Sequence, residues 1–387
     1  MLLLPSLAIV AYLVLRLVLP LPCGPGVKAL SSLVLLIAGL KFTWYARLGG
    51  AFFAPGLPRP LLLVMEALYA ALIILAFLTL LRDALALLLF LSRRLGTDWR
   101  LPFTPAAWSA GLSAAALILA GFGVWQSIRV PDTRSVELRV PDLPRGLDGF
   151  SLVQLSDLHI GPLLDREWLG AVVDRANALK PDVLVLTGDY IDGFAAELGD
   201  ELAPLAGLRA PYGVFAVTGN HEYYYRLDEW LPVFAHLGLD MLRNEHRVLE
   251  VNGARLVIAG VPDHAEARFG GPGPDVRLAF DGAPGAPGAS GEPGSPPAVR
   301  ILLQHQPRGA SSHQEADIQL SGHTHGGMIV FLQPLVARFN GGMVRGLYRT
   351  ARSQVYMHSG TGLWNGFSCR VGVPSEITRL VLRRAGA

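Results

Sequence analysis

The sequence is short of charged residues, and this shortage excludes two classes of protein. Aspartate, glutamate, lysine and arginine make up 17% of the 387 residues, whereas hydrophobic residues make up 51%. The mean hydropathy of +0.38 excludes an ordinary soluble protein along the whole chain. The net charge is only +2, whereas nucleic-acid-binding proteins are usually strongly basic. No nucleic acid is therefore expected as a partner.

Cysteine is also scarce, with only Cys23 and Cys369 in the chain. A disulfide framework needs more cysteines than this, and so does a zinc module with four cysteine ligands. Neither cysteine stands in a local motif, and the pair therefore says little about the compartment of the protein.

What the chain has in excess is apolar sequence, almost all of it before Trp125. Four stretches there approach the roughly 20 apolar residues that cross a bilayer. These stretches are residues 2–21, 30–53, 61–81 and 106–128. We therefore expect residues 1–128 to form an all-α transmembrane region of about four helices. Because Arg82 and Asp83 precede a further apolar run at 84–91, the third helix either ends there or continues outside the hydrocarbon.

We expect a multi-pass protein of the cell membrane, and the positions of its charged residues predict which side of the membrane each loop occupies. The predicted spans hold few ionisable groups, mainly Arg16, Lys41 and Glu66, most of which can snorkel to the membrane surface. The arginines that gather around the loop between the third and fourth spans are Arg82, Arg93, Arg94 and Arg100. Since cationic loops stay in the cytoplasm, we expect the portion after the last span to be extracytoplasmic. Three arginines at 129–139 argue in the opposite direction.

The portion after residue 128 has the pattern of an α/β protein. Residues 129–149 are expected to form a linker and an edge strand. From residue 150 onwards, short apolar runs rich in β-branched residues each end in a polar cluster, and helix-like stretches follow several of them. This alternation predicts an α/β fold with buried strands for residues 150–387. The runs are FSLVQLSD, PDVLVLTGD, YGVFAVTGN, VRILLQHQP and ADIQLSGHTH.

Further segments complete this prediction. Helices are expected at 165–180, 195–209 and 227–238, a hairpin with an Asn-Gly turn at 246–260, and a final strand near the C-terminus. Residues 270–298 are dominated by glycine, proline, alanine and serine, without the strict glycine period of collagen. We expect this stretch to be a disordered surface loop inserted between two strands.

Groups that can bind metal follow each of the five apolar runs. They are Asp157 and His159, Asp189, Asn220 and His221, His305, and His323 with His325. In open α/β sheets the ligand site lies beyond the carboxyl ends of the strands, so these groups are expected to meet. A mixed oxygen and nitrogen set suits Mn²⁺, Fe or Zn²⁺ better than Mg²⁺. The groups exceed the needs of one ion, and two divalent ions about 3.5–4 Å apart suit displacement at phosphorus.

The order D-x-H, G-D, G-N-H-E, a lone H and G-H-x-H resembles the signature of the calcineurin-like metallophosphoesterases. The resemblance covers the chain from about residue 150 to residue 382. The segments VTGNHEYY and SGHTHGG, with the tail SGTGLW…CRVGVPSEIT, are most similar to a branch of transmembrane and bacterial exported phosphoesterases. Met328 departs from that branch, which usually has glutamine there, and this departure affects a minor contact rather than the metal site.

The resemblance implies a fold, a site and a reaction. The fold is a four-layer α/β/β/α sandwich with the site at the strand ends. The implied ligands are Asp157, His159 and His325 for one ion, Asn220, His305 and His323 for the other, and Asp189 as the bridge. His221 is then the catalytic acid, and a water or hydroxide between the ions is the nucleophile. A phosphomonoester, phosphodiester or pyrophosphate bond would be hydrolysed.

Proximity to the bilayer favours a substrate in its headgroup layer, such as a phospholipid or a lipid-linked sugar pyrophosphate. Two alternatives remain open at this point. One is a transporter or receptor whose phosphoesterase domain is regulatory. The other is a non-catalytic interaction module that binds metal, although the loss of ligands expected of such a module is not seen in the sequence.

Overall fold

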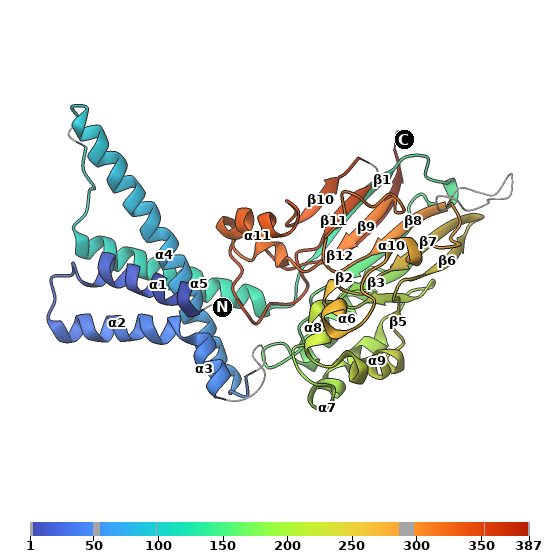
Figure 1. Cartoon of the computed structure of the whole chain (residues 1–387), viewed down its shortest axis with the longest axis horizontal. Helices are drawn as coiled ribbons and strands as arrows, with labels where there is room; N and C mark the ends of the chain where they lie inside the picture. Colours follow the sequence, from blue (N-terminus) through green and yellow to red (C-terminus); the bar gives the residue numbers. More distant parts are fainter. Residues whose placement is uncertain (1–2, 49–54, 98, 286–297, 352, 386–387) are drawn as a thin grey trace. The chain divides into compact units, whose positions relative to one another are not determined.

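A computed structural model of the chain describes residues 3–48, 55–97, 99–285, 298–351 and 353–385 (Figure 1). The chain divides into two compact units. The helical unit comprises Met1–Gln126 together with a short later segment, Gly366–Val371. The α/β unit comprises Ser127–Asn365 and Gly372–Ala387.

The helical unit is built from apolar helices. They are α1 (Leu3–Leu13), the π-helical segment η1 (Val14–Val18), α2 (Pro25–Gly39), α3 (Lys41–Arg47), α4 (Arg59–Arg94) and α5 (Pro105–Ile128). Among the described residues, α4 and α5 are each long and apolar enough to cross a membrane. Helices α2 and α3 satisfy the same criterion only as a pair bent by 61°, and Leu3–Val18 is shorter. Part of the expected span 30–53 lies outside the described residues.

Helix α4 contains the third predicted span, whose end the sequence left undecided. It continues without a break through Arg82 and Asp83, and its 36 residues reach about 54 Å at 1.5 Å per residue. Asp83 accepts hydrogen bonds from Tyr12 and Arg16 of the first helical stretch, at 2.9 and 2.7 Å. The polar pair Arg82 and Asp83 therefore lies inside the helix, where Asp83 bonds to the first helical stretch, and does not mark a helix end.

Two ionisable groups predicted to snorkel do not. The side chains of Lys41 and Glu66 are 1% and 3% exposed and form an ion pair of 2.5 Å. Tyr45 donates to Glu66 at 2.8 Å, and the backbone N–H of Ser368 donates to the same carboxylate at 3.1 Å. The snorkelling prediction is wrong for this pair, because each charge finds its partner inside the unit.

The α/β unit holds two six-stranded sheets in its described residues. The first has the order β1 (Thr133–Val140), β12 (Ile377–Arg384), β2 (Ser151–Leu155), β3 (Val183–Thr187), β4 (Val214–Val217) and β5 (Asp240–Met241). The second has the order β10 (Gly346–Arg349), β11 (Gln354–Met357), β9 (Ile318–Ser321), β8 (Ala298–Leu303), β7 (Ala254–Gly260) and β6 (Glu245–Val251). Strands β2, β3 and β4 are parallel, as are β7, β8 and β9, so the carboxyl ends of each set meet at one edge.

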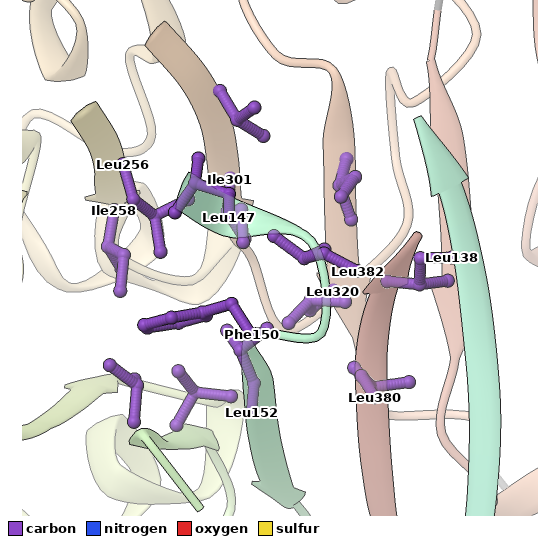
Figure 2. Close-up of a cluster of buried hydrophobic side chains, with 14 of the residues drawn as sticks. Leu138, Leu147, Phe150, Leu152, Leu256, Ile258, Ile301, Leu320, Leu380 and Leu382 are labelled. Atoms are coloured by element: carbon purple, nitrogen blue, oxygen red, sulfur yellow. The ribbon is translucent and has the colours of Figure 1, made fainter. Parts of the chain in front are cut away.

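The core lies between the two sheets (Figure 2). Leu152 and Leu380 come from the first sheet, and Leu256, Ile301 and Leu320 come from the second. All five side chains are fully buried and belong to one hydrophobic cluster. Since successive residues of a strand point to opposite faces, the other face of each sheet is free to take helices.

Helices cover those outer faces. Helix α6 (Arg166–Ala178) packs against the first sheet through its apolar side, and α9 (Leu227–His236) adjoins β5. Helix α10 (Val276–Ala279) packs on β7 of the second sheet. Helices on both sides of two facing sheets confirm the predicted fold class.

Two segments differ from the sequence prediction. Residues 195–209 form a short helix α7 (Ala195–Leu198) followed by a 3₁₀ helix η3 (Gly199–Gly207), because Pro204 cannot continue an α-helix. The expected disordered loop 270–298 is wrong in its first part, where α10 forms. Phe280 is 1% exposed and packs with Val257 and Leu302. Its later part, 286–297, lies outside the described residues.

Candidate metal centre

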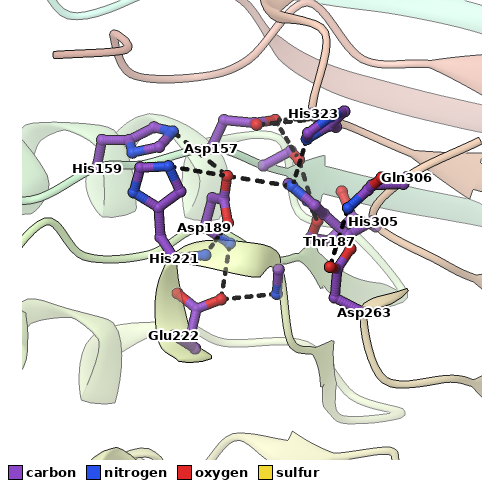
Figure 3. Close-up of polar contacts among 12 residues, drawn as sticks. Asp157, His159, Thr187, Asp189, His221, Glu222, Asp263, His305, Gln306 and His323 are labelled. Atoms are coloured by element: carbon purple, nitrogen blue, oxygen red, sulfur yellow. Dashed lines mark hydrogen bonds and ion pairs between the residues drawn. The ribbon is translucent and has the colours of Figure 1, made fainter. Parts of the chain in front are cut away.

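The two parallel sets of strands bring predicted metal-binding residues together at one edge of the sandwich, and Figure 3 shows Asp157, His159, Asp189, His305 and His323 among them. The residues that follow the strands are Asp157 and His159 after β2, Asp189 after β3, Asn220 and His221 after β4, His305 after β8, and His323 and His325 after β9. Asn220 and His221 begin the short helix α8 (Asn220–Tyr224). The aspartates and histidines that follow the strands belong to overlapping groups of ligand atoms.

Five of these residues have a backbone in the left-handed region, which non-glycine residues rarely adopt. Their φ angles are 54° for Asp157, 49° for His159, 56° for Asp189, 72° for His323 and 47° for His325. Such conformations cost of order 1 kcal/mol each or more and persist only where the surroundings enforce them. Asp157 N–H donates to Gly188 O at 2.9 Å, and His159 N–H donates to Asp189 O at 3.1 Å, which tie neighbouring strand ends together.

The first group of ligand atoms consists of Asp157, His159 and His325, whose donor atoms all lie within 4.8 Å of one another. His159 Nε2 lies 3.1 Å from His325 Nε2, and the latter lies 3.3 Å from Asp157 Oδ1. Ser156 Oγ and the backbone N–H of His323 donate to the Asp157 carboxylate, at 2.6 and 3.0 Å. These bonds hold the carboxylate facing the two imidazoles.

The second group consists of Asp189, His305 and His323, again within 4.8 Å. His305 Nε2 lies 3.1 Å from Asp189 Oδ2 and 3.3 Å from His323 Nδ1. His305 Nδ1 donates to the carbonyl of Thr187 at 2.7 Å. That bond fixes the ring and leaves Nε2 to face the group, as in imidazoles that bind metals.

Asp189 is a member of the second group and also lies close to the first. Its Oδ2 lies 3.7 Å from His159 Nε2 of the first group and 3.1 Å from His305 Nε2 of the second. Its other oxygen accepts the backbone N–H of His221 at 2.9 Å. The side-chain oxygen of Asn220, the residue before His221, is buried and has no hydrogen-bond partner among the described residues. A buried carbonyl oxygen without a donor is the form that a metal ligand takes.

Asp192 lies behind the first group and holds two histidines with one carboxylate. Its oxygens lie 3.1 Å from His159 Nδ1 and 2.5 Å from His221 Nδ1. Asn365 Nδ2 donates to the same carboxylate at 2.7 Å. The imidazoles of His159 and His221 meet edge to face, with ring centroids 4.6 Å apart. Both rings are therefore fixed by the nitrogen that points away from the cluster.

The charges of the cluster are strongly coupled. Burial opposes ionisation of Asp189, but the imidazoles of His305 and His221 outweigh it and hold the pKa of this carboxyl well below its usual value. Burial and the neighbouring His305 lower the pKa of His323 to about 3, which keeps that ring neutral. Burial also disfavours charge on His221, yet Asp189 and Asp192 raise its pKa to about 9.

Two glycines are needed because the chain approaches itself closely at the cluster. A Cβ at Gly219 would meet Asp189 Oδ1, and a Cβ at Gly322 would meet Ser156 Oγ and the carboxylate of Asp157. Nearby, Glu222 accepts backbone N–H groups from Gly219 and Tyr190, both at 2.6 Å. The G-N-H-E and G-H-x-H spacings thus have a steric reason as well as a chemical one.

The donor set fits two divalent cations. Imidazole nitrogens face one another at 3.1 and 3.3 Å beside carboxylates, an arrangement that a shared cation stabilises better than hydrogen bonds do. A third triad, His159, Asp189 and His221, also lies within 4.8 Å, so His221 is a possible ligand by distance alone. However, its Nε2 is 4.0 Å from Asp189 Oδ2, farther than that of His305.

Sequence reasoning missed Asp192 and Asn365. Asp192 stands three residues after Asp189 in the run GDYID, and that spacing is the signal that could have found it. Asn365 gave no such signal, since it lies in a loop far along the chain from its partner.

Comparisons with known proteins agree with this geometry. A family model described as calcineurin-like phosphoesterase matches residues 150–327. A transmembrane protein with metallophosphoesterase domain from Danio rerio is 35% identical over 280 residues, which cover 69% of this chain. The chain spans 61% of the length of that relative.

The chain covers a larger share of two bacterial relatives than of the Danio rerio protein. An uncharacterized metallophosphoesterase of Campylobacter jejuni is 31% identical over 325 residues, 83% of this chain and 81% of that protein. One from Aquifex aeolicus is 33% identical over 248 residues, 63% of this chain and 88% of that protein. The similarity therefore extends well beyond the motif residues.

Proposed function

The chain belongs to the calcineurin-like phosphoesterase family, and from that premise we propose that it is a membrane-anchored enzyme with two metal ions that hydrolyses a phosphate ester or pyrophosphate bond of a lipid-linked substrate. The observation that carries the proposal is the pairing of imidazoles and carboxylates around Asp189, whose one oxygen faces both groups of ligand atoms at 3.7 and 3.1 Å.

Each ligand role is part of this proposal. Asp157, His159 and His325 would hold one ion, Asn220, His305 and His323 would hold the other, and Asp189 would contribute to both. The unpartnered Oδ1 of Asn220 supports its role as a ligand. Two divalent cations held there, with Mn²⁺, Fe or Zn²⁺ best suited to the donors, supply Lewis acidity that activates water and offsets charge on phosphoryl oxygens.

The protein's own contribution to the reaction comes from the His221 side chain. Its Nδ1 is held by Asp192, which orients the ring and leaves Nε2 on the side of Asp189. With its pKa raised to about 9, His221 carries a proton at neutral pH and donates it to the leaving oxygen. Asn365 keeps the Asp192 carboxylate in place by donating to its second oxygen.

Membrane anchoring is supported by α4 and α5, which are long and apolar enough to span, and by the name of the Danio rerio relative. The arginines between these helices favour a cytoplasmic loop and an extracytoplasmic α/β unit. A reporter pair fused after Ala387 tests the orientation: alkaline phosphatase should be active there and green fluorescent protein dark. The reverse pattern would place the α/β unit in the cytoplasm.

The substrate is tested by assay of the purified full chain with Mn²⁺. Soluble p-nitrophenyl phosphodiesters are compared with phosphodiesters and pyrophosphates embedded in vesicles. The proposal predicts metal-dependent hydrolysis of both kinds, with higher kcat/KM for the embedded ones. Hydrolysis of soluble esters alone would reject the lipid-linked substrate but not the phosphoesterase, and absence of hydrolysis in both would favour a non-catalytic module.

A further inference from the structure

An exposed apolar surface follows the metal-binding loop directly. It is formed by the 3₁₀ helix η6 (Val330–Leu332) and helix α11 (Gln333–Phe339). Val330, Leu335 and Phe339 are 55%, 56% and 73% exposed, and Phe339 is the most exposed large hydrophobic residue in the described part of the α/β unit. We call these three residues the η6–α11 surface. Three such side chains within ten residues are more than the scattered exposure that is normal for soluble surfaces.

The shape of the segment concentrates these side chains. Leu335 and Phe339 are four residues apart on α11 and therefore share one side of the helix. Helix α11 itself buries no residue fully, so it lies on the unit rather than in its core.

The stretch of sequence that contains this surface carries charge of one sign. The sequence has no aspartate or glutamate between Asp317 and Glu376. Of the arginines in that stretch, Arg338 is next to Phe339 in the chain and is exposed. Large apolar side chains with a cationic border suit the boundary between the acyl chains and the headgroups of an anionic leaflet.

The surface is coupled to the metal centre by contact. Gln333 Nε2 donates to the carbonyl of Gly326 at 3.0 Å, and Gly326 follows the ligand His325. If α11 lies at a membrane surface, this hydrogen bond also fixes the height of the metal-binding loop above that surface.

Chain connectivity keeps the surface within reach of the bilayer. Only residues 129–132 separate the end of α5 from β1, a distance of about 14 Å when extended. The chain returns from the segment Gly366–Val371 of the helical unit at Gly372. A Cβ at Gly372 would lie 3.4 Å from Val330 Cβ, so the surface begins next to that return point.

We propose that the η6–α11 surface inserts into the interfacial layer of the bilayer that holds the helical unit, and that anionic phospholipid strengthens this insertion. The surface then sets the metal centre at the level of headgroup phosphates. This proposal rests on the membrane anchoring proposed above, and its second part rests on the proposed substrate.

Insertion is tested with the full chain in lipid nanodiscs. A Cys23→Ser background carries a single environment-sensitive dye at Phe339→Cys, while Leu278→Cys, another exposed apolar position at 55% exposure on α10, is the control. Cys369 is buried, and mass spectrometry confirms single labelling. Nitroxide lipids should quench the dye at position 339 severalfold more than the dye at 278, and more in phosphatidylglycerol than in phosphatidylcholine. Equal exposure of both dyes to aqueous iodide, without nitroxide quenching, would overturn insertion.

The consequence for catalysis is tested with a double variant, Leu335→Glu with Phe339→Glu, beside Leu278→Glu as its control. The double variant should raise the KM for a vesicle-embedded phosphodiester about tenfold or more, since burial of both side chains is lost. Its kcat/KM for a soluble nitrophenyl ester and its metal content should stay unchanged. Equal effects on embedded and soluble substrates would reject the role of the surface in substrate access. Dye insertion without hydrolysis of any lipid phosphate would reject the proposed substrate while supporting insertion.

Discussion

Replacement of His221 by asparagine separates proton donation from metal binding. His221 is 3% exposed, its Nδ1 is bonded to Asp192, and its pKa of about 9 keeps the ring mostly protonated at neutral pH. His221→Asn removes this acid but keeps an amide that can still bond to Asp192. Both metals and the stability of the fold should therefore be retained.

The size of the effect depends on the leaving group. A positioned general acid contributes about 10² to 10⁴ in rate, or about 3–5 kcal/mol, when the leaving alkoxide must be protonated. We expect a loss of this size in kcat/KM for an alkyl phosphodiester. For bis-p-nitrophenyl phosphate, whose leaving group needs little protonation, we expect a loss below about tenfold.

The assay compares both substrates for the wild type, His221→Asn and a control, His246→Asn. His246 lies on β6 and bonds to Ala279 O, away from the metal centre, so its replacement should change neither rate by more than about twofold. Metal content is measured on the same samples. Equal losses on both substrates would refute the acid role, and loss of metal would make His221 a ligand, as the triad with His159 and Asp189 allows.

Three further predictions concern the ligands and the core. Asp189→Ala should lose both ions, whereas His159→Ala should mainly weaken one site; two ions retained in Asp189→Ala would disprove the bridge. Asp189 raises the pKa of His305 well above its usual value against the effect of burial, so metal binding should displace a proton and strengthen as pH rises from 6 to 8. Calorimetry in buffers of different ionisation enthalpy checks this, and pH-independent affinity would contradict it. Phe280→Ala should lower the free energy of unfolding by about 3–5 kcal/mol in urea, against about 0.5 kcal/mol or less for the exposed Leu278→Ala; similar small losses would show that α10 does not pack.

The sequence was most informative where the signal is local. Alternating apolar runs with polar ends predicted β2, β3, β4, β8 and β9, and the groups at their ends meet in one cluster as expected. Membership of the calcineurin-like family, inferred from five motifs in order, is confirmed by the comparisons. These features depend on a few neighbouring residues, whose preferences are visible in a single sequence.

What sequence reasoning missed depends on contacts between distant segments. Asp192 acquires its role from His159 and His221, which lie 33 and 29 residues away along the chain. Most of the ionisable groups Arg16, Lys41 and Glu66 were expected to snorkel because each charge was weighed alone, whereas Lys41 and Glu66 pair with each other inside the helical unit. Residues 270–298 have the composition of a disordered loop, yet Phe280 within it finds an apolar site on the outer face of the second sheet.

The central claim, a phosphoesterase with two metal ions, is tested most directly by metal titration of the full chain. The purified protein is stripped with a chelator, and Mn²⁺ is added back while bound metal and hydrolysis of bis-p-nitrophenyl phosphate are measured together. We expect no hydrolysis in the stripped protein, binding of two ions per chain, and activity that rises chiefly with the second ion. Hydrolysis that survives complete removal of metal, or full activity with one ion bound, would contradict the claim.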